Sequence, residues 1–517
     1  MKISLRLVAV LFAIHSTIFA QPFHEFRAVW VATVDNIDWP SRGNYNADSQ
    51  KVEFIKLLDM HQRNGMNAII AQIRPATDAF YPSSIEPWSE WLTGKQGTPP
   101  NPYYDPLQFM IDETHKRGME FHAWCNPYRA EFQLGKSSIS STHITRIHPE
   151  WFLNYGDKKY FDPGNKEVWK YVVDVIRDIV RRYNVDAIHF DDYFYPYRIA
   201  GKEFPDQSSY SKFGVGLTKE DWRRSNVDSV IFLLSKMIKE ENKYCKFGIS
   251  PFGVWRNVDR DPEGSNTKAG QTNFDDLYAD ILLWLKNGWI DYVAPQLYWE
   301  FGMRAAPYEV LLDWWSKHSY GKHCYIGLGI FKAGANAAWR DKTQLTRQIR
   351  ALRNYPEVQG AIYFSSKSFE NNPNGWSDSL KNNYYSTPAL VPSMPWIDSA
   401  KPTTPIVTNI NAVNGGINMN RYSFETNLHA GPSIKKLAVY KSTADSKSGR
   451  DTLALTQVIL PDMNGNFNFA VSTELKPKLQ SFSIFVTAVS ANNVESEFSS
   501  PVNFIFKEGV GWSYEKK

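Results

Sequence analysis

The chain has 517 residues, more than one hydrophobic core usually organises, so we expect two folded domains. Its 58 Lys and Arg residues nearly balance 54 Asp and Glu residues, and no basic run is present that would neutralise a phosphate backbone, which argues against nucleic acid as a partner. The aromatic content, with 18 Trp, 27 Tyr and 31 Phe, favours either a ligand with apolar faces, such as a sugar, or a large aromatic core.

Residues 1–20 have the features of a secretory signal peptide. Lys2 and Arg6 precede an apolar run over 7–14, and Ala20 fits the cleavage position, although Ile18 is larger than the small residue preferred there. No later stretch has the roughly 20 uninterrupted apolar residues of a membrane-spanning helix. We therefore predict a protein exported to the periplasm or the cell exterior, without a transmembrane segment.

Eight short apolar runs follow in order, and most are separated by segments of helical periodicity. They span 28–34, 68–73, 120–125, 187–190, 247–250, 292–297, 325–330 and 361–364. Three of the connections end in Gly65, Gly118 or Gly288, as expected where a helix closes through a left-handed residue. Alternating strands and helices predict parallel pairing, and eight units over 21–386 predict a (β/α)8 TIM barrel, with an open doubly wound sheet as the alternative.

The pattern changes after the predicted barrel. Residues 387–405 are rich in proline and predict a linker. Short alternating runs separated by turn residues then predict a small all-β sandwich over 406–507, followed by a tail over 508–517. The three cysteines, Cys125, Cys245 and Cys324, are odd in number and scattered, so we expect buried free thiols rather than a disulfide framework.

Polar and aromatic residues directly follow the predicted strands, where the active site of a barrel enzyme lies. From these positions we predict three catalytic residues, Asp191, Asp192 and Glu300. We predict that the substrate-binding residues are Asp35, Arg74, Asn126, Tyr128, Tyr193, Trp255, Arg256, Gln296, Tyr298 and Trp299.

The adjacent carboxylates Asp191 and Asp192 are the sharpest signal in the sequence. Like charges repel, and burial beside aromatic residues raises the pKa of at least one carboxyl, which keeps it protonated near neutral pH. A protonated acid beside an ionised carboxylate is what cleavage of a glycosidic bond requires. The alternative is a structural role, in which both side chains cap the following turn or pair with Arg74 or Arg129.

Four blocks resemble the glycosyl hydrolase-like family ten, also called domain of unknown function 187. They are FRAVWVAT (26–33), IHFDDYFYP (188–196), ISPFGVWR (249–256) and APQLYWE (294–300), and the resemblance covers roughly residues 26–385. It implies a glycosidase-type barrel, and similar members include an enterobacterial enzyme that digests peptidoglycan glycan strands stripped of their peptides. The small domain resembles fibronectin type III by pattern alone.

Two mechanisms remain open at this point. The Asp pair is similar to the catalytic pair of O-GlcNAcases, and Gln296 with Tyr298 is similar to the chitinase arrangement beside the substrate acetamido group. By that analogy Asp191 orients the acetamido group, whose oxygen attacks the anomeric carbon, and Asp192 is the general acid. Alternatively, Glu300 is the second carboxylate of a conventional pair with Asp192, at a separation of about 5 Å for retention and roughly 6.5 to 9.5 Å for inversion.

The other chemistries considered fit less well. His122 and His189 lie within strands without a partner at metal-ligand spacing, so we expect core roles and no metal. No nucleophile elbow, phosphate loop or dinucleotide fingerprint is present, and we predict no cofactor. The sequence thus favours a hydrolase of an amino-sugar polysaccharide, with peptidoglycan glycan strands as the leading substrate and no protein partner evident. The alternatives are a non-catalytic glycan-binding protein and a glycosidase acting on another polysaccharide.

Overall fold

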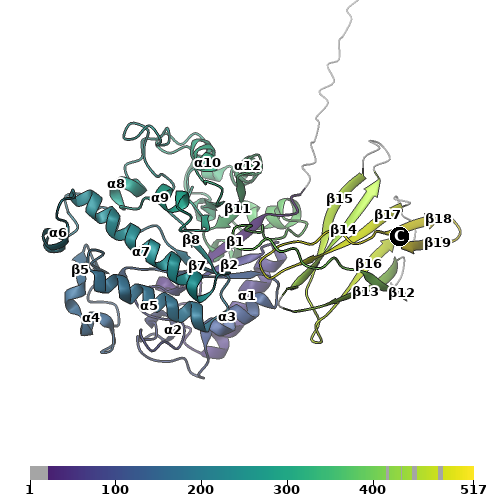
Figure 1. The fold of residues 1–517 in the computed structure, drawn as a ribbon, viewed down its shortest axis with the longest axis horizontal. Helices are drawn as coiled ribbons and strands as arrows, with labels where there is room; N and C mark the ends of the chain where they lie inside the picture. Colours follow the sequence, from purple (N-terminus) through teal and green to yellow (C-terminus); the bar gives the residue numbers. More distant parts are fainter. Residues whose placement is uncertain (1–20, 415–418, 432, 445–450, 475–480, 517) are drawn as a thin grey trace, which may run out of the picture.

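The computed structural model describes residues 21–414, 419–431, 433–444, 451–474 and 481–516. The predicted signal peptide lies outside the described residues. A barrel with surrounding helices and a smaller unit built of strands lie side by side (Figure 1).

The barrel is a closed ring of eight parallel strands in the order β1-β2-β3-β7-β8-β9-β10-β11. The strands are β1 (Phe26–Val31), β2 (Ala68–Arg74), β3 (Glu120–Cys125), β7 (Ala187–Phe190), β8 (Lys246–Ile249), β9 (Tyr292–Val293), β10 (His323–Leu328) and β11 (Val358–Tyr363). Most are buried along their whole length because one face fills the barrel and the other packs on helices. The predicted TIM barrel is confirmed, with an open sheet excluded.

The longer helices have explicit start signals. The helices of eight or more residues are α1 (Ala47–Arg63), α3 (Pro106–His115), α5 (Lys166–Arg182), α7 (Lys219–Glu241), α10 (Tyr308–Lys317) and α12 (Gln344–Leu352). Asn46, Asp105, Asn165 and Thr218 precede α1, α3, α5 and α7, and the side chain of each accepts a hydrogen bond from a backbone N–H of the first turn.

Short elements fill the connections. The α-helical ones are α2 (Glu90–Thr93), α4 (Ile144–Ile147), α6 (Gln207–Phe213), α8 (Asn273–Asp276), α9 (Ile281–Lys286), α11 (Ala337–Arg340), α13 (Ser366–Glu370) and α14 (Trp376–Ser379). Other turns are η1 (Val34–Asn36), η2 (Pro149–Trp151), η3 (Ile330–Lys332), η4 (Pro373–Gly375) and η5 (Leu380–Tyr384). A small antiparallel sheet of β4 (Arg129–Glu131), β6 (Lys158–Phe161) and β5 (Phe152–Tyr155) is inserted after β3.

The C-terminal unit packs two antiparallel sheets face to face. One contains β12 (Val407–Asn414), β13 (Met419–His429) and β16 (Asn466–Glu474); the other contains β15 (Asp451–Ile459), β14 (Lys436–Ala444), β17 (Ser481–Val489), β18 (Val502–Lys507) and β19 (Gly511–Lys516). Stacked rings, Phe424 on Phe469 and Phe482 on Phe504, form its core. The predicted β-sandwich is confirmed.

The predicted tail over 508–517 is wrong as a structural description. It contains β19, which pairs antiparallel with β18 over its whole length. Trp512 and Tyr514, two residues apart on one face, donate hydrogen bonds to the carbonyls of Glu474 and Ile410 on the opposite sheet. Only Ser513 separates the two rings, and the charged residues on either side, Glu508, Glu515 and Lys516, obscured this alternation in the sequence.

The Pro-rich segment 387–405 is more than a spacer. Val391 and Met394 are buried with Phe26 and Tyr325 at the amino-terminal end of the barrel. Leu390 packs with Ala438 and other residues of the sandwich. The segment therefore closes the bottom of the barrel and holds the sandwich against it, so that the mouth of the barrel faces away from the sandwich.

Cutting the chain after Tyr385 is therefore expected to destabilise the barrel. Loss of two buried side chains such as Val391 and Met394 costs about 2–5 kcal/mol each, a large share of the roughly 5–15 kcal/mol that stabilises a domain. In a thermal melt, a chain ending at Tyr385 should unfold well below a matched chain ending at Ala400, which retains both side chains. Equal melting temperatures would show that the segment does not stabilise the barrel.

Candidate active site at the mouth of the barrel

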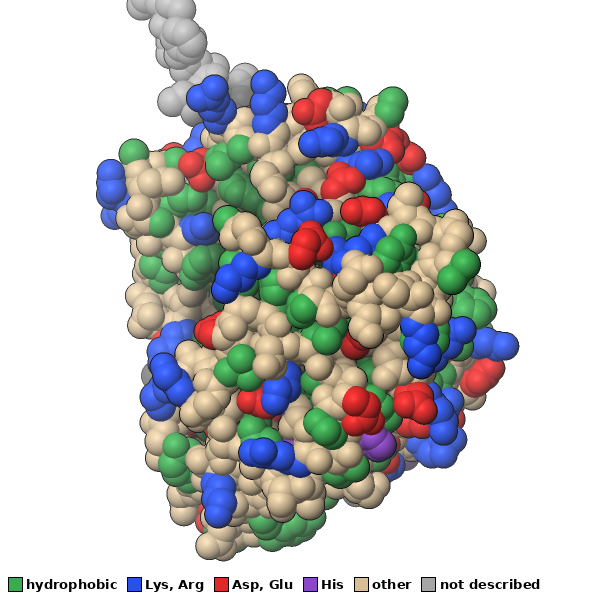
Figure 2. Space-filling model, turned by 90° about the vertical axis from the view of Figure 1, so that its left-hand side faces the viewer, with side chains coloured by type: hydrophobic (Ala, Val, Ile, Leu, Met, Phe, Trp, Pro, Cys, Tyr) green, Lys and Arg blue, Asp and Glu red, His purple; other side chains and the backbone are tan. Residues whose placement is uncertain are grey.

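The carboxyl ends of the strands form the face of the molecule farthest from the sandwich. Figure 2 shows this face, where acidic and basic side chains are interspersed with hydrophobic ones. The segments that follow β2, β3, β7, β8 and β9 meet here because the strands are parallel.

Asp191 and Asp192 follow β7 directly. Asp191 shares the inward face of the strand with His189, because side chains alternate along a strand. The backbone N–H of Asp192 donates to Oδ1 of Asp191 at 2.9 Å, and the hydroxyl of Tyr197 donates to Oδ2 of Asp192. Asp192 is only 2% exposed, whereas Asp191 is partly exposed.

The two carboxyls differ in burial, and burial changes the pKa of Asp192. Burial raises the pKa of Asp192 well above its ordinary value, and the neighbouring Asp191 raises it further, which outweighs the hydrogen bond from Tyr197. The mouth therefore holds a buried acid, whose raised pKa favours the protonated form, next to a more exposed carboxyl. Arg74 and Arg129, the partners considered in the structural alternative, bind other groups: Arg74 pairs with Glu86, and Arg129 donates to the carbonyl of Pro75.

An aromatic rim lies beside the Asp pair. Tyr193 contacts Tyr197, Tyr197 contacts Phe252, and Phe252 contacts Trp299, with ring centroids 5.4 to 6.3 Å apart. Arg129 donates to the hydroxyl of Tyr193 at 2.5 Å and so fixes this ring. Such a row of rings offers stacking surfaces for the apolar faces of sugars.

A second aromatic group contains Tyr298, Phe331, Phe364 and Trp30, with successive ring centroids 5.5 to 6.2 Å apart. A side chain at Gly329 would approach the Tyr298 ring to 3.1 Å, so the glycine leaves room for it. Burial raises the pKa of the Tyr298 hydroxyl well above its ordinary value, and the negative charge of the nearby Asp pair adds to this. Tyr298 is thus a neutral hydroxyl at the mouth, near enough to the Asp pair for the charge of that pair to act on it.

Three inward-facing side chains of β2 and β3 carry N–H groups without a hydrogen-bond partner among the described residues. They are Gln72 Nε2, Trp124 Nε1 and Asn126 Nδ2, all buried. Asn126 follows Cys125, the partner in register of Phe190, and therefore lies next to Asp191. Asn126 was predicted from its position after the strand. Gln72 and Trp124 were missed because they lie inside apolar runs, although alternation along β2 and β3 places them on the inward face.

Glu300 is held by the connection after β10. Its Oε2 accepts from Trp339 Nε1 at 2.8 Å and its Oε1 accepts from Asn336 Nδ2 at 3.3 Å. Gln296, earlier on the same segment, donates to the Ser250 carbonyl at 3.0 Å. Both oxygens of Glu300 thus already have donors, which favours a role in anchoring the segment around residues 336–339.

Five predicted binding residues are placed differently. A β-bulge between Gln72 and Arg74 turns the fully buried Arg74 outward to Glu86. Trp255 packs on Trp314 behind β8, and Arg256 pairs with Asp261 and Asp275. Tyr128 is buried in the outer core, and Asp35 is ion-paired with Arg42 at the rim. These side chains build the loops around the mouth.

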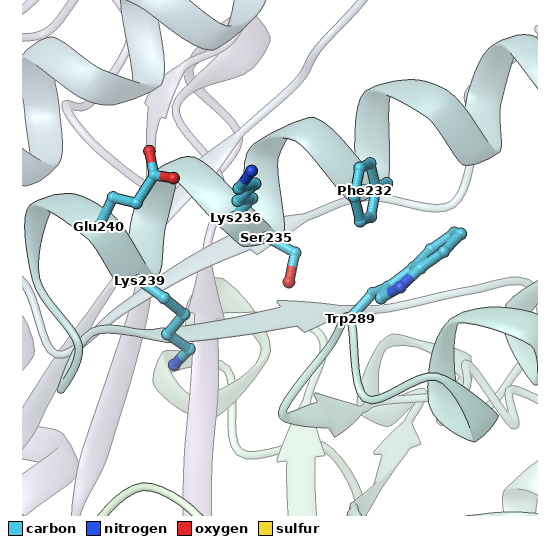
Figure 3. A pocket seen from close by; sticks show the side chains of 6 residues that line it. All are labelled: Phe232, Ser235, Lys236, Lys239, Glu240 and Trp289. Atoms are coloured by element: carbon cyan, nitrogen blue, oxygen red, sulfur yellow. The ribbon is translucent and has the colours of Figure 1, made fainter.

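Other candidate sites are weaker. A shallow hollow of about 440 Å³ lies on the outside of the barrel between α7 and Trp289 (Figure 3). Its Lys239 is already engaged by Asp291. Within the described ranges, no group of three His, Cys, Asp or Glu side chains is placed to hold a metal ion, and no helix is long and apolar enough to cross a membrane. All three cysteines are buried free thiols, as expected.

Comparison with known proteins shows the family to which this protein belongs. The model described as glycosyl hydrolase-like 10 matches residues 25–345. Glycosyl hydrolase YngK of Bacillus subtilis (strain 168) is 50% identical over 398 residues, 76% of this chain and 78% of YngK. Glycosyl hydrolase DigH of Escherichia coli (strain K12) is 38% identical over 370 residues, 66% of this chain and 83% of DigH. The chain therefore belongs to the glycosyl hydrolase-like 10 family.

Proposed function

We propose that the protein is an exported glycoside hydrolase that cleaves glycosidic bonds in an amino-sugar polysaccharide, with peptidoglycan glycan strands as the leading substrate. The observation that carries the proposal is the buried Asp192, whose pKa is raised, beside the more exposed Asp191 at the barrel mouth. Membership of a glycosyl hydrolase-like family, with relatives named as glycosyl hydrolases, supports the reaction class.

The geometry suits a reaction in which the substrate supplies the nucleophile. The acetamido oxygen attacks the anomeric carbon as the bond to the leaving oxygen breaks, and Asp192 gives its proton to that oxygen. Asp191 stabilises the positive charge that develops on the oxazolinium ring. Asp192, now ionised, takes a proton from water as the water opens the ring. Tyr298 donates to the acetamido group in this scheme, and Glu300 remains an anchor.

The unpaired donors of β2 and β3 support an acceptor-rich sugar. Gln72, Trp124 and Asn126 present N–H groups to the mouth, and buried donors without partners are costly unless a ligand or water fills them. Hydroxyl, acetamido and carboxylate oxygens of an N-acetylated sugar acid could all accept these hydrogen bonds. The aromatic rim can stack on the sugar faces at the same time.

Peptide-free peptidoglycan glycan, before and after chemical removal of its acetyl groups, tests the substrate class. We expect mass spectrometry to show shorter chains from the acetylated glycan only. The Asp191→Asn, Asp192→Asn double variant is the matched control. Equal cleavage of both forms would refute the acetamido mechanism. Binding of the glycan without any products would instead favour the alternative of a non-catalytic glycan-binding protein.

Replacing Trp124 by Phe tests the donor group. The change keeps an aromatic ring but removes the Nε1 donor, so we expect KM to rise by about tenfold, the loss of roughly one hydrogen bond, with kcat changed less. Steady-state kinetics on a soluble glycan oligomer measure both. Trp289→Phe, on the outside of the barrel, is the control and should leave both constants unchanged. An unchanged KM in Trp124→Phe would remove Trp124 from substrate binding.

A further inference from the structure

A chain of hydrogen bonds runs through the inside of the barrel, along its axis. Trp30 Nε1 donates to His189 Nε2 at 3.1 Å, and His189 Nδ1 lies 2.9 Å from the Tyr292 hydroxyl. The same hydroxyl lies 2.9 Å from His122 Nδ1, and His122 Nε2 lies 3.0 Å from Glu120 Oε2. All five side chains are buried, at 4% exposure or less. They come from β1, β7, β9 and β3, and they include His122 and His189, the two histidines expected from the sequence to have core roles.

The groups at the two ends of this hydrogen-bond chain fix the direction in which each hydrogen bond is donated. An indole N–H can only donate, so His189 Nε2 is the acceptor and Nδ1 carries the proton that is donated to Tyr292. The Tyr292 hydroxyl then donates to His122 Nδ1, and His122 Nε2–H donates to the Glu120 carboxylate. Burial lowers the pKa of His189 well below its ordinary value, in agreement with a neutral ring. Every link is therefore satisfied in a single arrangement of protons.

At the lower end of the hydrogen-bond chain, the sandwich supplies a further donor to Glu120. Asn493 Nδ2 donates to Glu120 Oε1 at 2.7 Å, and Lys246 forms an ion pair with the same carboxylate. Burial alone would raise the pKa of Glu120, but Lys246 and His122 hold it well below the ordinary value. Asn493 is 4% exposed and lies in a turn after β17, with φ 60°. The sandwich thus places a side chain inside the amino-terminal end of the barrel.

The upper end of the chain lies under the mouth. His189 precedes Asp191 by two residues on the same inward face of β7. The Trp30 ring contacts Phe364, which contacts Tyr298. Asn126, the residue after β3, lies six positions beyond Glu120, a span of about 20 Å at a strand rise of roughly 3.3 Å per residue.

We propose that the sandwich is part of the active unit, and that Asn493 is a positioning residue that sets the orientation of Trp30 beneath the mouth through the chain of Glu120, His122, Tyr292 and His189. The Glu120 carboxylate accepts from both Asn493 and His122, so loss of the Asn493 donor alters the acceptor of His122 and, through Tyr292 and His189, the acceptor of the Trp30 indole. The kinetic consequence rests on the proposed function, whereas the effect on the indole does not.

Asn493→Gly is the informative variant. Glycine accepts the left-handed backbone at this position, so the amide is lost without backbone strain. The matched control is Asn492→Ala, which removes a hydrogen bond from the same turn to Asp398 but leaves the chain intact. Asn493→Asp, which also tolerates this backbone, is a second variant that replaces the N–H donor by an oxygen facing Glu120.

The primary readout is the indole N–H resonance of Trp30 in a ¹H–¹⁵N spectrum of the full chain, assigned with Trp30→Phe. We expect this resonance to shift and to exchange faster in Asn493→Gly and Asn493→Asp, and to stay in place in Asn492→Ala. On the glycan, kcat/KM should fall about two- to thirtyfold, the range measured for residues along coupled networks. An unmoved resonance in either folded Asn493 variant would overturn the proposal. A moved resonance in these variants, together with no glycan cleavage by the unaltered protein, would support the hydrogen-bond chain while refuting the proposed function.

Discussion

Replacing Asp192 by Asn is expected to lower kcat by about 10² to 10⁴, the usual contribution of a general acid. The side chain keeps its shape and still accepts the hydrogen bond from Tyr197, but it can no longer give a proton to the leaving oxygen. Steady-state kinetics measure the loss, and circular dichroism checks that the fold is intact. Activity near that of the unaltered protein would remove Asp192 from the mechanism.

The same substitution is not expected to lower the stability of the fold. The pKa of Asp192 is raised in the folded protein, so the folded state keeps a proton that the unfolded chain releases at its ordinary pKa. The stability that the protonated carboxyl contributes is full below that ordinary pKa and is lost as pH rises through the folded pKa. The amide of the Asp192→Asn variant does not titrate and has no such loss, so we expect a melting temperature at neutral pH that is equal or higher. A clear fall would point to a structural role.

Replacing Asp191 by Asn is expected to lower kcat by at least about 10², because removing one well-placed electrostatic group from an active site commonly costs this much. The matched change Glu300→Gln should mainly raise KM. An amide at this position can accept from only one of its two donors, Trp339 and Asn336, so the loop loosens while the chemistry remains.

A thiazoline inhibitor that mimics the oxazolinium ring should bind the unaltered protein tightly and Asp191→Asn weakly. The opposite pattern would favour Glu300 as nucleophile or base. It would consist of an inactive Glu300→Gln variant that azide rescues, an Asp191→Asn variant that is merely slowed, and a thiazoline without effect.

The barrel could be predicted because each strand is a short apolar run followed by a helical pattern, and both periods survive in the sequence. β10 and β11 begin two and three residues earlier than the apolar runs suggested, since His323 and Val358 are already paired. The role of the Pro-rich segment was not predictable, because nothing local to Val391 and Met394 indicates that they fill the bottom of a distant barrel.

The location of side chains at the barrel mouth was predictable where position after a strand determines direction, as for Asp191, Asp192, Asn126 and Tyr298. Prediction failed where the backbone departs from regular alternation. The bulge before Arg74 reverses its side, and the loop after β8 carries Trp255 and Arg256 away from the mouth. Simple alternation would have found Gln72 and Trp124, but polar or aromatic residues inside an apolar run are usually assigned to the core.

The most direct measurement is mass spectrometry of peptide-free peptidoglycan glycan after incubation with the unaltered protein and, in parallel, with Asp192→Asn at equal concentration. The account predicts shortened glycan chains from the unaltered protein and about 10² to 10⁴ times less product from the variant in the same time. Intact glycan with both proteins, or equal product from both, would contradict the claim that the Asp pair at the barrel mouth cleaves this polysaccharide.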